Sequence, residues 1–256
     1  MKRHIRIILL LTALIILLFA ISSTVFAATD TIPVPKVNIS LDGSSSPKDY
    51  VNDIKILILL TILTLLPSIV IMMTSFTRII VTFSFLKSAL GAQQSIPNQI
   101  LVGLAIFLTI FIMAPTYNKI NENAIKPYLD NKITQEQAME EGAKPLREFM
   151  LKQTRQKDLK LFVDASNVQG DITKDNVPLY VVIPAFAISE LKTAFQIGFL
   201  LYLPFLVIDI VVSSVLMSMG MFMLPPVMVS LPFKLLLFVM VDGWNLLIKA
   251  LITSFS

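Results

Sequence analysis

Residues able to do chemistry are few in this chain, and several of them lie inside its apolar segments. Ser189 and Lys192 are three positions apart, so a helix would place a hydroxyl and an amine on one face, as a serine–lysine hydrolase needs. Glu190, Asp209 and Asp242 also interrupt hydrophobic sequence, where ionisable groups usually face a bundle interior or a water-filled path. A lone buried carboxylate would be costly and would protonate. We expect these three to be structural charges satisfied within an assembly rather than proton carriers.

The remaining residues do not favour catalysis. The chain has no cysteine and a single histidine, His4. His4 lies in residues 1–27, which have a basic start, an apolar run and a small-residue cleavage site, the pattern of a cleaved signal peptide. Cleavage would leave neither imidazole nor thiolate, the usual general base, nucleophile and zinc ligands. We therefore expect no enzyme, no cofactor and no metal; an uncleaved first anchor is the alternative for residues 1–27.

The composition is that of a membrane protein. Of the 256 residues, 55% are hydrophobic and 15% charged, and the mean hydropathy is +0.77. Soluble domains carry about 25% charged residues. The formal charge of +4 would fall to +1 on loss of Lys2, Arg3 and Arg6 with the signal peptide, so the basic balance indicates no nucleic-acid partner.

A break in an apolar run between residues 207 and 234 is the most informative feature. Its marked residues are, in order, Met217, Met219, Gly220, Met221, Phe222, Met223, Pro225 and Pro226. Two adjacent prolines cannot continue a helix, and at membrane depth a broken backbone is tolerated only where protein buries it or where it lines a cavity. We expect a Met-rich loop that forms a functional constriction. The alternative is that the methionines fill gaps in a core.

The elements that must position these residues are expected to be helices. Residues 28–49 have the turn-rich composition of a flexible exported linker. Residues 50–115 predict a hydrophobic hairpin, whose second apolar segment ends before Pro115 and is short for the roughly 20 residues that cross a bilayer. Arg78 and Lys87 are expected in the connecting turn, which the positive-inside rule places on the cytoplasmic side.

Residues 116–179 form the polar part of the chain and are expected to be a helical region outside the cytoplasm. The stretch 134–137 has the pattern of a capping box, Gly142 is a plausible helix stop, and Pro145 suits the first turn of a following helix. Phe149 and Phe162 lie on amphipathic pieces. They could pack a small helical core or form an interface with neighbouring subunits.

Residues 180–256 predict further hydrophobic helices. Between Ser189 and Gln196 the polar positions fall on one side of a helix. Pro204 is expected to separate this segment from the one that carries Asp209. The last segment is interrupted by Asp242–Gly243, which makes a plain spanning helix a poor description of it.

Four motifs occur in the order FSFLKSALGAQQSIPNQ, PLREFMLKQTR, PAFAISELKTAFQIGFLLYLPFLVIDIVVSSVLMSMGMFMLPP and LPFKLLLFVMVDGWNLL. In these motifs the chain resembles the FliP/SctR family of type III secretion export-gate proteins, from about Lys48 to its end. The resemblance implies an all-α fold of bent helical hairpins that assemble into a helical, cone-like gate. It also implies a multi-pass protein of the bacterial inner membrane in the flagellar basal body. Five copies would assemble with one FliR and several FliQ, contacting FlhB and lying near FlhA, with FliO as an assembly factor.

The resemblance also implies roles for particular residues. Unfolded flagellar subunits would pass through the gate, and a methionine gasket would close it at Met221, Phe222 and Met223, where relatives often have three methionines. Phe149, Phe162 and Glu190 fall in motifs that the family uses for subunit assembly.

Two other classes compete with this export-gate reading. A secondary transporter or ion channel would use the intramembrane charges of Glu190, Lys192, Asp209 and Asp242, although the two halves of the chain have no visible inverted repeat. An intramembrane hydrolase would use the Ser189 and Lys192 pair.

Overall fold

The computed structural model describes residues 47–93, 95–166 and 177–255. The chain divides into two compact units, Met1–Asp53 and Ile54–Ser256. The expected signal peptide and most of the expected linker lie outside the described residues. In the first unit only the backbone at the start of one helix, residues 47–53, is described.

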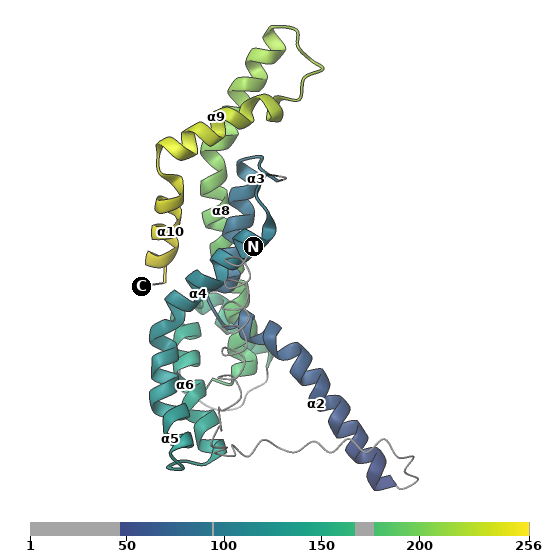
Figure 1. Cartoon of the computed structure of the whole chain (residues 1–256), viewed down its shortest axis with the longest axis vertical. Helices are drawn as coiled ribbons and strands as arrows, with labels where there is room; N and C mark the ends of the chain where they lie inside the picture. The colour runs from purple at the N-terminus through teal and green to yellow at the C-terminus, as the bar shows by residue number, and fades with distance from the viewer. Residues whose placement is uncertain (1–46, 94, 167–176, 256) are drawn as a thin grey trace, which may run out of the picture. The chain divides into compact units, whose positions relative to one another are not determined.

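Every regular element among the described residues is helical, which confirms the all-α prediction. The elements are α2 (Pro47–Met72), α3 (Phe76–Ala89), α4 (Asn98–Ile120), a π-helical turn η1 (Asn121–Ile125), α5 (Lys126–Leu129), α6 (Gln135–Gln153), α7 (Gln156–Ala165), α8 (Leu179–Ser218), α9 (Pro226–Met240) and α10 (Gly243–Thr253). Figure 1 labels most of them.

Within the described residues, three helical stretches are long and apolar enough to cross a membrane: Ile54–Met72, Asn98–Leu129 and Leu179–Ser218. Helices α9 and α10 bend by 63° at a short break and would make a fourth if the bent pair counts as one span. The break lies at Asp242, whose backbone is left-handed (φ +50°), as the Asp–Gly interruption predicts. The second unit is therefore a membrane-type helical protein.

Prolines end fewer helices than the sequence predicts. Pro115 lies inside α4, which continues to Ile120, and Pro204 lies inside α8, which runs unbroken for 40 residues. An internal proline removes one backbone hydrogen bond, but ending the helix in apolar surroundings would leave several backbone groups without partners. The expected breaks at these two prolines are therefore wrong, and the two helices are longer than expected.

Helix α6 starts where the sequence predicts but does not stop there. The backbone N–H of Gln137 donates to Thr134 Oγ1 at 3.3 Å, and the N–H of Thr134 donates to Gln137 Oε1 at 3.0 Å, which confirms the capping box. Gly142 and Pro145 both lie inside α6, so the expected stop and restart are wrong. A Cβ added at Gly142 would lie 3.5 Å from Ala124 of η1, an ordinary contact distance.

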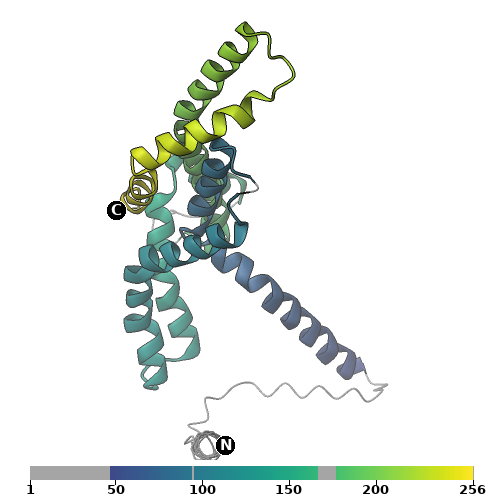
Figure 2. The same ribbon diagram turned by 45° about the horizontal axis from the view of Figure 1, so that its top comes forward.

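In the part of the second unit that the structure describes, side chains form two buried clusters. The larger joins α3, α4, α8, α9 and α10 around Ile79, Phe83, Leu86, Phe238 and Leu251. The smaller joins α6 and α7 to the start of α8; its buried members are Met150, Val177, Val181, Val182 and Phe186. Figure 2 shows α3 running beside α8, and α9 returning along α8 before the chain turns into α10.

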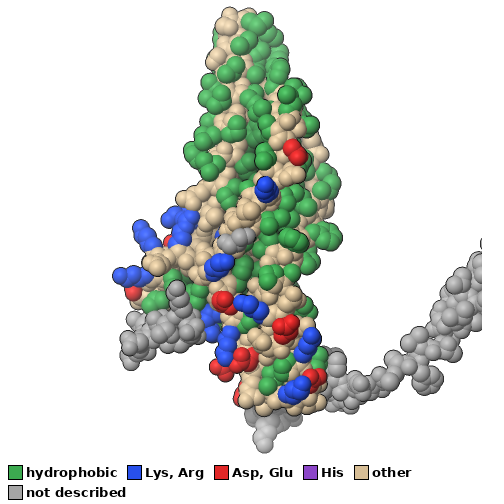
Figure 3. Space-filling view, turned by 90° about the vertical axis from the view of Figure 1, so that its left-hand side faces the viewer, with side chains coloured by type: hydrophobic (Ala, Val, Ile, Leu, Met, Phe, Trp, Pro, Cys, Tyr) green, Lys and Arg blue, Asp and Glu red, His purple; other side chains and the backbone are tan. Residues whose placement is uncertain are grey.

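Charge and apolar surface lie at different ends of the second unit. Hydrophobic side chains cover the part formed by α8 and α9, whereas Lys, Arg, Asp and Glu gather over the end that carries α5 and α6 (Figure 3). The charged end includes exposed pairs such as Lys144 with Glu141, where the hydrogen bond that Lys144 donates to the Glu141 carboxylate raises the pKa of the Lys144 ammonium. Exposed pairs of this kind contribute little to stability, so the charges mainly keep this end in water.

Candidate functional site

The Met-rich loop joins α8 to α9 as a sharply defined turn. Helix α8 closes with Gly220 in the left-handed conformation (φ +77°), the N–H of Gly220 on the carbonyl of Met217, and the N–H of Met221 on the carbonyl of Leu216. This is a Schellman ending, in which glycine accepts a backbone geometry that strains other residues. Pro225 then caps α9, and Pro226 occupies its first turn, where a missing N–H costs nothing. The predicted break in the helix is confirmed.

The side chains of this loop stand free of the core of the chain. Met223 is 96% exposed and Phe222 is 78% exposed, and Met217, Met219 and Met221 are also exposed. Methionines that fill gaps in a core would be buried. These methionines therefore do not fill a core within the single chain. An exposed apolar tip of this kind indicates a contact surface.

An ion pair between a buried lysine and a partly buried aspartate lies at the base of the same hairpin. Lys234 Nζ of α9 lies 2.6 Å from Asp209 Oδ2 of α8, and the Ser230 hydroxyl donates to the other carboxylate oxygen. Lys234 is 2% exposed and also donates to the carbonyl of Ala89 at 3.2 Å. Ala89 ends α3, where carbonyl groups lack helical partners and a cation is favourable. Asp209 is thus satisfied within the chain.

Glu190 is also paired within the chain, by Arg78. Arg78 Nε donates to Glu190 Oε2 at 2.9 Å, and Arg78 Nη2 bonds to Glu190 Oε1. The same guanidinium donates to Gln153 Oε1 at 3.0 Å and to the carbonyl of Ser254 at 3.0 Å, and its carbon lies 3.7 Å from the ring centre of Phe255. A planar, bidentate donor suits such a buried hub.

The expected place of Arg78 in the connecting turn of the hairpin is therefore wrong. Arg78 lies in α3 and is 2% exposed, because a buried carboxylate on α8 needs a cation beside it. Lys87 also lies in α3, near its end, and donates to Asn98 Oδ1.

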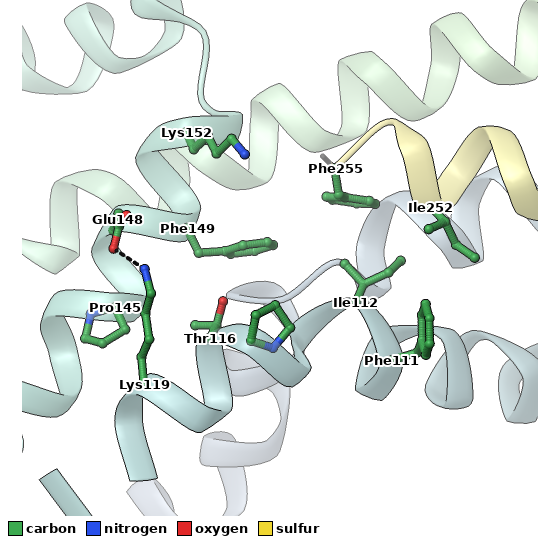
Figure 4. Close-up of a pocket in the computed structure, with 11 residues that line it drawn as sticks. Phe111, Ile112, Thr116, Lys119, Pro145, Glu148, Phe149, Lys152, Ile252 and Phe255 are labelled. Atoms are coloured by element: carbon green, nitrogen blue, oxygen red, sulfur yellow. Dashed lines mark hydrogen bonds and ion pairs between the residues drawn. The ribbon is translucent and has the colours of Figure 1, made fainter. Parts of the chain in front are cut away.

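Phe149 and Phe162 both join packing within the chain. The half-buried Phe149 ring lies 5.9 Å from the ring of Phe186 and 6.2 Å from that of Phe255, stacked on the latter. Figure 4 shows Phe149 and Phe255 facing a hollow of about 390 Å³ between α4, α6 and the end of the chain. Phe162 of α7 packs half-buried against the smaller cluster.

Ser189 forms hydrogen bonds with residues at the start of α7. Its hydroxyl donates to Asp158 Oδ2 at 2.8 Å and accepts the backbone N–H of Arg155 at 3.1 Å. Arg155 Nη2 also donates to Thr193 Oγ1 and Gln196 Oε1, so the polar face of α8 receives the start of α7. Lys192 is exposed.

The residues that sequence reasoning missed are the partners of those it found. They are Arg155, Ser230, Lys234, Ser254 and Phe255, together with the pairing role of Arg78. One signal could have identified two of them: each carboxylate in an apolar segment requires a cation, and Arg78 and Lys234 also lie in apolar segments.

Comparison with known proteins assigns the chain to a family. The sequence profile of the FliP family matches residues 59–251. The flagellar biosynthetic protein FliP of Bacillus subtilis is 54% identical over 217 residues, which cover 85% of this chain and 98% of that protein. The protein of the same name from Caulobacter vibrioides is 49% identical over 244 residues, covering 95% and 91%. That of Borreliella burgdorferi is 47% identical over 248 residues, covering 93% and 96%. With likeness of this degree over nearly its whole length, the chain belongs to the FliP family of flagellar biosynthetic proteins.

Proposed function

We propose that this chain is a pore-forming subunit of the flagellar type III protein export gate, with the 219–225 loop as its seal. The observation that carries the proposal is the exposed apolar tip at the α8–α9 turn, where Met223 and Phe222 have almost no cover from their own chain. Several copies arranged about one axis would bring these tips together.

The chemistry of the loop suits a gate for unfolded chains. An idle export pore must not leak protons or ions, and a hydrophobic constriction closes by dewetting. Methionine is unbranched and can repack around varied side chains during passage. Phe222 keeps the apolar bulk but is stiffer, so Met221 and Met223 supply most of the adaptability.

The partners follow from the family resemblance. Five copies of this chain would assemble with FliR and FliQ in the inner membrane at the flagellar basal body, contact FlhB and lie near FlhA, with FliO assisting assembly. Long apolar faces on α2 and α8 are exposed in the single chain, and such faces need lipid or protein around them. The mass of the intact complex, purified with FliR and FliQ, checks the copy number.

The transporter and hydrolase readings receive less support. Glu190 and Asp209 each carry a close cationic partner, so neither is a free carrier for protons or ions. Ser189 uses its hydroxyl to hold Asp158 and Arg155.

Leakage of a small solute through the complex, reconstituted in vesicles, tests the seal. We expect Met221→Ala with Met223→Ala to raise leakage, because removing the long side chains widens the constriction. Met139→Ala is the matched control, since Met139 is an exposed methionine on α6, outside the loop. Unchanged leakage in the loop variant, together with normal flagellar secretion, would remove the seal assignment.

A further inference from the structure

The base of the α8–α9 hairpin has a polar cluster. Its hydrogen bonds and its ion pair form at one alignment of α9 along α8. Asp209 takes Lys234 on one oxygen and Ser230 on the other, and Lys234 also reaches the carbonyl of Ala89 on α3. Sliding α9 along α8 would separate the buried Lys234 ammonium from the partly buried Asp209 carboxylate. Leaving a buried charge without its partner is strongly unfavourable.

Beside this cluster, the apolar side chains of α8 and α9 are loosely packed. A hollow of about 490 Å³ lies between α8 and α9. Its lining residues are Val207, Ile208, Val211, Val212, Val215, Leu216, Val229 and Phe233. Contacts among such side chains are non-directional, so a slipped hairpin would keep most of their burial. Packing therefore specifies the register weakly, and the ion pair specifies it strongly.

The helices transmit that register to the loop. Asp209 lies nine residues before the end of α8, and Lys234 lies eight residues after the start of α9. At 1.5 Å per residue, each of these two helical segments is about 12–14 Å long between the ion pair and the loop. Because a helix is rigid over this length, a slip of α9 along α8 at the ion pair also displaces the start of α9, where the loop ends.

We propose that Asp209 and Lys234 are positioning residues that fix the height of the 219–225 loop, with Ser230 holding the carboxylate in place. The inference rests on the proposed function, because the loop height matters only where loops from several copies must meet. It gives the intramembrane charges a role in register rather than in proton transport.

Distances within the hairpin test this proposal. Spin labels at Ile210→Cys on α8 and Met228→Cys on α9 report the register, since both side chains are exposed. The natural chain has no cysteine, so labelled chains diluted with unlabelled ones in the assembled complex give distances within a single chain. Helical content measured by circular dichroism confirms folding of every variant.

Three variants separate register from folding. Asp209→Asn with Lys234→Met removes both charges, so no unpaired charge remains buried and the chain is expected to fold. We expect this variant to show a broadened distance distribution, with displacements of up to one helical turn, about 5 Å. Asp209→Glu keeps the pair, and Lys249→Met removes an exposed cation from α10; both are expected to keep the narrow distribution.

The outcomes distinguish this inference from the proposed seal. Broadened distances in the double variant, together with leakage as large as that of the Met221 and Met223 variant, support it. A narrow, unshifted distribution in a folded double variant overturns it, even where the methionine variant leaks. Broadened distances with no leakage in either variant would instead overturn the seal and leave the ion pair as the determinant of register.

Discussion

Arg78 connects α3, α6, α8 and the end of the chain through one guanidinium. Its partners Glu190, Gln153 and Ser254 lie far apart in sequence, and Phe255 covers its face. Each bond replaces water that the buried guanidinium has lost, so the group is stable only with its partners in place. Glu190 and Phe149 are therefore parts of one intrachain network, whatever they also contact in an assembly.

We predict that Glu190→Gln lowers the free energy of unfolding by about 3–5 kcal/mol, because it leaves Arg78 charged and buried without a carboxylate. Chemical denaturation of the purified chain in detergent, followed by circular dichroism, measures the change. Glu148→Gln is the control, since Glu148 pairs with Lys119 on the surface and such pairs contribute little. Equal stability of the two variants would contradict the prediction.

At the level of single residues, the sequence identified the groups but not their partners. The Met-rich loop is local, so the spacing of Gly220 and Pro225–Pro226 was enough to predict it. The pairing of Arg78 with Glu190 spans 112 positions, and Lys234 is 25 positions from Asp209. Distant pairs depend on how helices pack, which the periodicity of one segment does not specify.

Helices α3 and α8 approach each other closely at Gly198. A Cβ added there would lie 2.5 Å from two carbons of the Phe85 ring and 2.9 Å from its Cβ. These atoms are near the backbone of α3, so the ring cannot simply swing aside. The close approach of α3 and α8 therefore requires a residue without a side chain at position 198.

We predict that Gly198→Ala destabilises the chain by about 1–3 kcal/mol, the usual cost of overpacking. Gly103→Ala is the matched control, because Gly103 lies inside α4 with nothing within 4 Å of an added Cβ. There alanine should be neutral or stabilising by up to about 1 kcal/mol, since it favours the helix. Thermal unfolding in detergent compares them, and a stabilised Gly198→Ala would show that α3 and α8 are less tightly packed.

At the level of elements, the all-α class and the break before α9 followed from the sequence, but helix ends did not. Pro115 and Pro204 are strong stop signals by local rules, and Pro145 is a start signal, yet α4, α6 and α8 all continue through them. Tertiary packing and an apolar surrounding outweigh one lost hydrogen bond, and neither is visible in a short window of sequence.

At the level of the whole second unit, burial of Arg78 removes one of the two cations from which the sequence predicts the orientation in the membrane. The positive-inside rule counts cations that stand free near the ends of membrane segments, and Arg78 is paired within the core. Lys87 near the end of α3 remains, together with the signal-peptide pattern at the start of the chain. Both still favour a cytoplasmic α3–α4 connection and an external position for the charged end that carries α5 and α6.

Cysteine labelling tests this orientation. The chain has no cysteine of its own, so each introduced cysteine is the single site that a maleimide labels. We predict that Glu136→Cys on α6 reacts with a membrane-impermeant maleimide added outside spheroplasts, because its exposed side chain lies at the charged end. Gln93→Cys, in the α3–α4 connection, should react only after permeabilisation. If both positions react from outside, the apolar helices do not hold these two ends on opposite sides of the bilayer. The hydrophobic surface of α8 and α9 would then be covered by other subunits rather than by lipid.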